Sequence, residues 1–131
     1  MEVLMPRFSR RSLSKLNTCD VRIISVMQEV VKHFDCTILE GSRTEERQKE
    51  LIAEGKSKTM KSKHLRSPSL AIDCVPYPID WEDRERITYF AGYVMGIAKA
   101  KGIDLRWGGD WDQDTEVKDN GFDDLVHFEL V

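Results

Sequence analysis

The chain has 131 residues, of which 40% are hydrophobic and 33% charged, and its formal net charge is −3. This composition excludes a disordered chain, and because no apolar run approaches about 20 residues we expect no membrane insertion. Residues 1–66 carry 14 basic and 9 acidic side chains, whereas residues 67–131 carry 6 and 14, which argues against a nucleic-acid binder. We expect one domain over residues 1–131 and a monomer.

The three cysteines, Cys19, Cys36 and Cys74, form no C-x-x-C pair, which predicts reduced thiols in the core. The N-terminal stretch has basic residues but no continuous apolar segment. We therefore expect no signal peptide and synthesis in a cytoplasm.

The first half of the chain predicts two helices separated by a strand. Apolar residues recur at helical spacing between about Thr18 and Phe34, and Thr18 or Asp20 can cap the helix. The short run 36–40 is partly β-branched and ends at Gly41, as expected for a strand that leads into a turn. Thr44 then opens a polar helix that Gly55 can close.

The second half begins with a basic, polar segment, 56–70, which predicts an exposed loop. Residues 71–75 are strand-like and are followed by two prolines, and a long helix starts near Trp81 or Glu82 and stops at Gly102. Short apolar pieces surround 105–107 and 126–130. Because helices and strands do not alternate regularly, we expect an α+β fold in which a small antiparallel sheet packs with two main helices and a shorter one.

Two of the three histidines lie near carboxylates in a pattern that suggests a metal site. His64 precedes Asp73 by nine residues, and His127 follows Asp124 by three. Two imidazoles and one carboxylate are a common ligand set for catalytic zinc, with a fourth position left open. Taken singly, each residue has a simpler explanation: His64 as a solvated loop residue, Asp73 as an ion-pair partner, and Asp124 as part of a turn.

Strand geometry allows this site. Side chains alternate along a strand, so Asp73 faces away from Ile72 and Cys74, which can be buried. His127 and Glu129 share one face of the last strand. We expect Asp124 in the turn before that strand, where its carboxylate can be aimed at a water molecule.

At these residues the sequence resembles the phage L-alanyl-D-glutamate peptidases. These endolysins belong, with D-alanyl-D-alanine carboxypeptidases and dipeptidases, to the LAS zinc peptidases. The resemblance runs in register from about Thr37 to the C-terminus, and it rests on five segments: Gly41-Ser42-Arg43-Thr44, Ser62-Lys63-His64, Ala71-Ile72-Asp73, Trp107-Gly108-Gly109-Asp110-Trp111 and Asp124-x-x-His127-x-Glu129.

The resemblance implies that His64, Asp73 and His127 bind zinc, that Asp124 is the catalytic carboxylate, and that Arg43 steadies the substrate carbonyl or carboxylate. One departure is the spacing between His64 and Asp73, which is longer than is usual in the family, with Ser69 near the place of a family glycine. Extra loop residues between two anchored positions cost little, so we expect the ligands to keep their places.

The implied activity is zinc-dependent hydrolysis of the L-alanyl-D-glutamate amide in peptidoglycan stem peptides during host cell lysis. The enzyme would be made in the host bacterial cytoplasm and would reach the cell wall or periplasm after membrane permeabilisation. We expect no separate cell-wall-binding domain. The alternatives are a D-alanyl-D-alanine carboxypeptidase or dipeptidase with the same site, and a zinc-binding module without catalysis.

Other residues receive weaker expectations. Ser62 or Glu129 can orient a ligand imidazole, although an exposed Glu129 without a role is an equal alternative. Trp107 and Trp111 can line a substrate groove or pack in the core. The alternating carboxylates Asp110, Asp112, Asp114 and Glu116 are reminiscent of a calcium loop. They lack the glycine and the final glutamate of an EF-hand, so a solvated acidic loop is the simpler interpretation and regulatory calcium the alternative.

Overall fold

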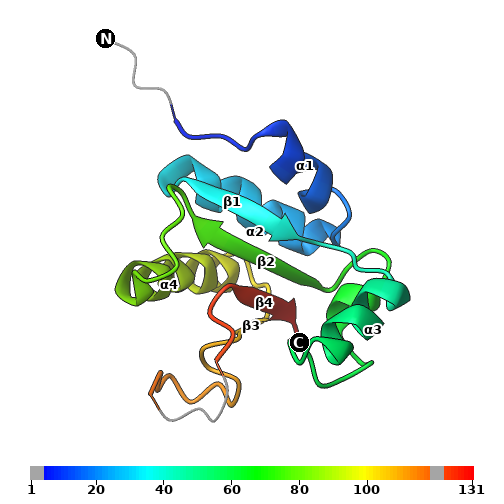
Figure 1. Ribbon diagram of the computed structural model, residues 1–131. Helices are drawn as coiled ribbons and strands as arrows, with labels where there is room; N and C mark the ends of the chain where they lie inside the picture. Colours follow the sequence, from blue (N-terminus) through cyan, green and yellow to red (C-terminus); the bar gives the residue numbers. More distant parts are fainter. Residues whose placement is uncertain (1–4, 119–122) are drawn as a thin grey trace.

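The computed structural model describes residues 5–118 and 123–131. Its centre is one four-stranded antiparallel sheet with the order β1-β2-β4-β3 (Figure 1). The predicted α+β fold with a small antiparallel sheet is confirmed. The strands are β1 (Cys36–Glu40), β2 (Ala71–Pro76), β3 (Leu105–Trp107) and β4 (His127–Leu130).

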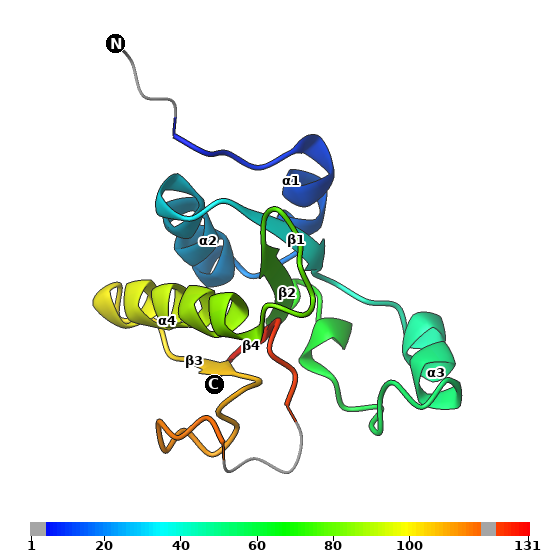
Figure 2. The ribbon, with the colours of Figure 1, turned by 60° about the vertical axis from the view of Figure 1, so that its left-hand side comes forward.

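The two long helices, α2 (Val21–His33) and α4 (Arg84–Ala100), lie on one side of the sheet, and α3 (Glu45–Ala53) lies on the other (Figure 2). Each begins where an aspartate or threonine side chain accepts a backbone N–H of the first turn: Asp20, Asp83 and Thr44. Within the described residues, no helix has the length and apolar character needed to cross a membrane.

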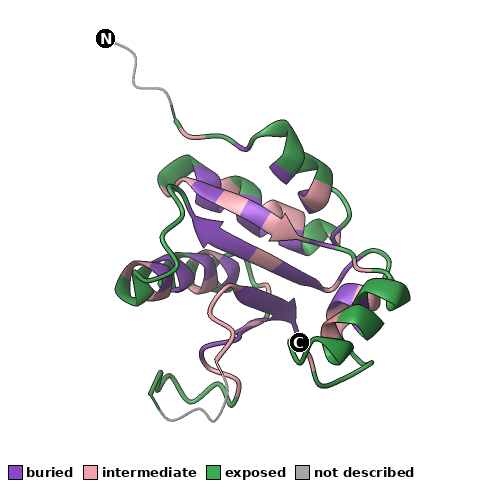
Figure 3. Ribbon diagram, in the orientation of Figure 1, coloured by how far each residue is buried: buried purple, intermediate pink, exposed green. Residues whose placement is uncertain are grey.

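The core fills the space between the sheet and the two long helices (Figure 3). On β2, Ile72 and Cys74 point into it, and on β4 Phe128 is fully buried and packs edge-on against Phe90 of α4. Since neighbours along a strand face opposite ways, Asp73 and His127 are placed on the other face of the sheet. The apolar face therefore decides which face carries polar side chains.

Three expectations need correction. A further short helix, α1 (Arg10–Leu16), packs on β1, where the Ser12 hydroxyl accepts the N–H of Ile38. Strand β2 continues to Pro76, which is tolerated at the end of the strand because the next backbone hydrogen bond to this side, to the carbonyl of Asp35, is donated by Tyr77. The segment 56–70 is not wholly exposed, because η1 (Lys63–Leu65) buries His64 and Ser69 is also buried. The three cysteines are free and buried, as predicted.

Candidate metal centre

The strand register places Asp73 beside His127. The two residues are direct partners across the β2–β4 pair, and Glu40 of β1 is the partner of Asp73 on its other side. Directly opposed residues of antiparallel strands point to the same face with close Cβ atoms. The sheet itself therefore brings together a carboxylate and an imidazole that are 54 residues apart.

His64 reaches the same point from the loop that precedes β2. The Ser62 hydroxyl accepts the backbone N–H of His64 and so caps the short helix η1. The imidazole Nδ1 lies 2.7 Å from the carbonyl oxygen of Gly41, which can only accept, so Nδ1 carries the proton. Ser62 thus positions the backbone of His64, and Gly41 orients its ring.

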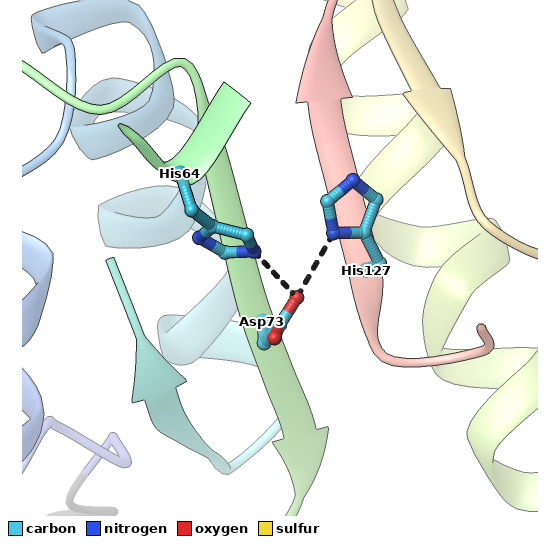
Figure 4. A group of neighbouring side chains, drawn as sticks. All are labelled: His64, Asp73 and His127. Carbon is cyan, nitrogen blue, oxygen red and sulfur yellow. Dashed lines mark hydrogen bonds and ion pairs between the residues drawn. The ribbon is translucent and has the colours of Figure 1, made fainter. Parts of the chain in front are cut away.

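Both imidazoles turn a nitrogen toward one carboxylate oxygen (Figure 4). His64 Nε2 and His127 Nδ1 each lie 3.1 Å from Asp73 Oδ1. One ligand atom from each of the three residues lies within 4.8 Å of the others, and both histidines are buried. We call His64, Asp73 and His127 the buried triad; its donor set could hold a metal ion.

The charges of the buried triad are those of a site built around a cation. Burial by itself would raise the pKa of Asp73, but hydrogen bonds from His127 and His64 hold this pKa well below its usual range. Burial would lower the pKa of His127, but the contacts with Asp73 and Glu129 raise it to about 9. Without a metal ion, a proton thus lies between the His127 ring and the Asp73 carboxylate. A bound metal ion would supply the positive charge in place of this proton.

Glu129 makes the outer contact of His127. Its Oε1 lies 2.9 Å from His127 Nε2, two residues away on the same face of β4. Burial would raise the pKa of Glu129, but the hydrogen bonds from His127 and Arg106 lower it to about 2. Glu129 is therefore an ionised, buried carboxylate, and the alternative of an exposed residue without contacts is wrong.

Arg43 lies at the rim of the buried triad and is held from two sides. Its Nε donates to Glu40, its Nη1 donates to Gln48 at 2.7 Å, and its Nη2 lies 3.9 Å from Asp73 Oδ2. Gln48, fully buried on α3, also donates to the hydroxyl of Ser57 and to the carbonyl of Thr59. The guanidinium is thus fixed with one nitrogen directed to the site.

Asp124 lies in the turn before β4, as expected. Its backbone N–H donates to Gly108 at 2.8 Å, and its carbonyl accepts the N–H of His127 at 3.1 Å. Burial and the negative charge of Asp73 raise the pKa of its carboxyl, while the positive charges of the two triad histidines and Arg43 oppose the rise. The side chain is therefore close enough to the buried triad to respond to each of its charges.

Gly108 has to be glycine for this turn to approach β3. A Cβ at position 108 would lie 2.1 Å from the carbonyl oxygen of Asp124 and 2.9 Å from its carbonyl carbon. Those are backbone atoms, which cannot swing away as a side chain can. The Trp107-Gly108-Gly109 motif thus has a packing reason, which is to seat the segment that carries Asp124.

The long spacing between His64 and Asp73 does not separate the two side chains. The intervening Ser69 is buried, its N–H donates to Thr18, and its carbonyl accepts from Asp20. The added loop residues are thus anchored against the start of α2, consistent with the small cost expected of a longer loop.

The two tryptophans have different positions. Trp107 is buried, and its indole N–H donates to the carbonyl of Leu125 at 2.8 Å, so it supports the Asp124 turn from within the core. The ring of Trp111 lies 5.5 Å from that of His127. Of the two, Trp111 is the one beside the buried triad, and a groove-lining role for Trp107 stays a prediction.

The acidic segment 110–116, which we call the acidic loop, forms a separate cluster. The carboxylates of Asp110, Asp112 and Asp114 converge, but Asp112 and Asp114 are exposed. Asp110 accepts the backbone N–H groups of Asp114 and Thr115, and Asp114 accepts that of Glu116. These carboxylates thus shape their own turn, and calcium binding here stays a prediction.

Sequence reasoning did not single out Gln48, Lys63 or Arg106. Gln48 lies in a helix with little apolar periodicity, so nothing in the pattern marks it as buried. Arg106 and Glu129 are opposite partners across the β3–β4 pair, with Arg106 Nη2 2.8 Å from Glu129 Oε2. Once the register is known, their opposite charges are a usable signal.

Comparison with known proteins identifies the family of the chain. Residues 4–131 match the family model described as phage L-alanyl-D-glutamate peptidase. The L-alanyl-D-glutamate peptidase of Escherichia phage T5 is 33% identical over 136 residues, covering 95% of this chain and 98% of that protein. The crystal structure of the Serratia marcescens L-Ala D-Glu endopeptidase ChiX matches with a TM-score of 0.77 and 29% identity, over 95% of this chain and 90% of that one. The chain belongs to the phage L-alanyl-D-glutamate peptidase family.

Proposed function

We propose that this protein is a zinc-dependent endopeptidase that hydrolyses the L-alanyl-D-glutamate amide of peptidoglycan stem peptides, acting on the cell wall during host lysis. The observation that carries the proposal is the convergence of His64, Asp73 and His127, with Asp124 beside them, in a chain of this family. The choice of the L-alanyl-D-glutamate amide as the bond that is cut rests on the relatives, which are named for this activity.

His64 Nε2, one oxygen of Asp73 and His127 Nδ1 are the atoms that would hold the ion. The other ring nitrogen of each histidine is already hydrogen-bonded, that of His64 to Gly41 and that of His127 to Glu129. In the neutral rings the lone pairs of His64 Nε2 and His127 Nδ1 are therefore both directed to the Asp73 carboxylate. A zinc ion bound by two imidazoles and one carboxylate supplies a Lewis acid that polarises a carbonyl and lowers the pKa of water.

Asp124 is proposed as the general base and then the general acid. A carboxylate that takes a proton from water and returns it to a leaving amine works best with a pKa shifted toward neutrality. Burial and the nearby Asp73 shift the pKa of Asp124 in this direction. Its backbone is fixed by Gly108 and by His127, so the carboxylate stays in place during the proton transfer.

Arg43 is proposed to stabilise the negative charge that develops on the substrate carbonyl oxygen. Its guanidinium is held by Glu40 and Gln48, so little reorganisation is needed when charge develops. One nitrogen remains on the side of Asp73, where the substrate amide must approach.

The test is to incubate the protein with muropeptides, with and without a chelator, and to identify the products by mass spectrometry. We expect chelator-sensitive cleavage that creates an N-terminal D-glutamate and returns when zinc is added. Release of free D-alanine would instead identify a carboxypeptidase, and the absence of chelator-sensitive cleavage would exclude both enzymatic functions.

Asp124→Ala is the matched variant for the mechanism. The hydrogen bonds of Asp124 to Gly108 and His127 use backbone atoms, so the substitution leaves them in place. We expect folding and bound zinc to persist while turnover falls by about 100-fold or more. Unchanged turnover would refute the role assigned to Asp124.

A further inference from the structure

The carboxylate of Glu129 is the meeting point of side chains from three elements. Its Oε1 faces His127 Nε2 on β4, and its Oε2 lies 2.8 Å from Arg106 Nη2 on β3 and 3.3 Å from Lys63 Nζ on η1. The Glu129 side chain is only 9% exposed. We call Lys63, Arg106 and Glu129 the Glu129 cluster.

Arg106 is linked to His127 indirectly, through Glu129 and through Trp111. Through Glu129 it holds the outer nitrogen of the imidazole. Its guanidinium carbon also lies 5.8 Å from the ring centre of Trp111, whose indole lies beside the imidazole of His127. Arg106, Glu129, His127 and Trp111 thus form a ring of contacts, in which Arg106 lies against both Glu129 and Trp111.

Lys63 ties the two histidines to each other. It precedes His64 in η1, and its ammonium forms an ion pair with the Glu129 carboxylate and donates to the carbonyl of Leu130 on β4. The turn that carries one histidine is thereby fastened to the strand that carries the other. The distance between the two imidazoles depends on this contact as well as on the sheet.

A carboxylate accepts hydrogen bonds and does not donate them, so Glu129 selects the tautomer of His127 with its proton on Nε2. In this neutral form of the ring, which is the form that binds a metal ion, the Nδ1 lone pair is directed to the side of Asp73 and His64. Arg106 and Lys63 hold the Glu129 carboxylate in place from two sides, which fixes its contact with the ring of His127.

We propose that Lys63, Arg106 and Glu129 are positioning residues for the metal: acting through Glu129, the two cations set the orientation of His127 and hence the affinity of the site for a divalent ion. This inference rests on the proposed function of the buried triad and deepens it. Neither cation needs to touch the substrate or the metal.

The experiment measures the zinc affinity of the folded protein by competition with a chromophoric chelator and records the absorption of the Co2+-loaded form. We expect Glu129→Gln to weaken zinc binding by about 10- to 100-fold and to alter the Co2+ spectrum. Arg106→Met should weaken binding by about 10-fold. In the double variant the loss should be close to that of Glu129→Gln alone and well below the sum of the two single losses, because Arg106 acts mainly through Glu129.

Two variants separate positioning from general stability. Arg47→Met removes an exposed ion pair with Glu50 on α3 and should leave the affinity for zinc unchanged. Arg106→Lys should restore most of the affinity, because only one guanidinium nitrogen contacts Glu129 and, among the described residues, Arg106 Nε has no hydrogen-bond partner. Circular dichroism in chelator confirms that each variant is folded, and Lys63→Met takes the place of Arg106→Met if that variant does not fold.

The inference is overturned if folded Arg106→Met binds zinc within twofold of the parent protein, or if its effect adds fully to that of Glu129→Gln. Its failure is distinct from failure of the proposed function. A parent protein that binds zinc tightly and cleaves no muropeptide would contradict the function and leave the positioning role intact. If the parent protein cleaves muropeptides while Arg106→Met binds zinc normally, the positioning role is contradicted and the proposed function stands.

Discussion

Asp73 and Asp112 each lie in a cluster whose side chains could bind a cation, yet their surroundings differ. Asp73 comes from the central strand β2 and meets histidines from η1 and β4, so three separate elements converge. Asp112 belongs to a single exposed loop whose carboxylates accept N–H groups of the same loop. The buried triad is therefore brought together by the tertiary fold, against the unfavourable energy of burying charged groups. The carboxylates of the acidic loop lie close together because of the local geometry of their own turn.

The comparison shows that closely spaced carboxylates are weak evidence of a metal site. Hydrogen bonds to the ring nitrogens that point away from the site are stronger evidence, because they orient the ligands. In the buried triad the outer nitrogen of each histidine has an acceptor, Gly41 for His64 and Glu129 for His127. Those contacts leave the inner nitrogens with a common direction. The acidic loop contains no imidazole to be oriented in this way.

The largest expected effect separates the two clusters directly. Asp73→Ala should abolish zinc binding and lower muropeptide cleavage by about a thousandfold or more, because two buried imidazoles lose their common partner. Asp112→Ala, the matched control, should keep stoichiometric zinc. Metal content by mass spectrometry and the cleavage assay measure both. Equal zinc loss in the two variants would remove the distinction drawn between the clusters.

A smaller effect is expected from Gly108→Ala, which tests the backbone around Asp124 without touching a proposed ligand. The added Cβ meets the carbonyl of Asp124, so the turn must shift. We expect turnover to fall by about 100-fold, as misplacement of a catalytic group does, while zinc remains bound. Gly92→Ala is a suitable control, since no heavy atom lies within 4 Å of its added Cβ. Normal turnover in Gly108→Ala would show that the turn tolerates displacement.

The pH dependence of stability should distinguish the clusters more finely. In chelator, the raised pKa of His127 stabilises the fold fully below its ordinary value of 6.5, and this contribution is lost as the pH rises through about 9. We expect the free energy of unfolding to fall by on the order of 2 kcal/mol over that range. Denaturant titrations at a series of pH values measure it.

The opposite sign is expected when zinc is present. Zinc binds the neutral imidazole, so its stabilisation of the fold should increase as the pH rises toward 9. The Asp112→Ala variant should reproduce both profiles, because the acidic loop takes no part in them. A flat profile in chelator would contradict the charge arrangement assigned to His127 and Asp73.

The smallest effect is expected for the stability of Asp112→Ala itself. Asp112 is exposed, and its side chain accepts the N–H of Asp114 at 3.3 Å within the same loop. We expect a change of less than about 0.5 kcal/mol in the free energy of unfolding without calcium. Calorimetric titration of the zinc-loaded protein with calcium then tests the remaining hypothesis for this loop. The absence of heat at millimolar calcium would end it.

Sequence patterns predicted those parts of the fold whose signals are local. Strand β1 and the caps of α2 and α3 follow from turn residues and short-range periodicity, and the structure has them at the expected places. Helix α1 was missed because seven mostly polar residues bury only Ser12 and Leu16 and show no apolar stripe. It is stabilised by contact with β1, which no local pattern reveals.

The candidate site shows the same division. His64, Asp73, His127 and Asp124 could be proposed from motifs, and the structure brings the first three together with Asp124 nearby. The supporting contacts could not be proposed, because they join residues far apart in the sequence: Lys63 with Leu130, and Arg106 with Glu129. The first depends on the position of η1 against β4 and the second on the pairing of β3 with β4, and periodicity alone gives neither.

The pairing of Asp73 with His127 makes the proposed metal site depend on the correct register of β2 and β4. A shift of β4 by one residue would turn His127 and Glu129 into the core and expose Phe128, which is fully buried in the correct register. The energetic penalty for burying those charged groups excludes the misaligned sheet. Only correctly paired molecules can then capture the ion, so metal uptake would report on native assembly, and conservative changes at Phe128 should alter catalysis without any contact with substrate.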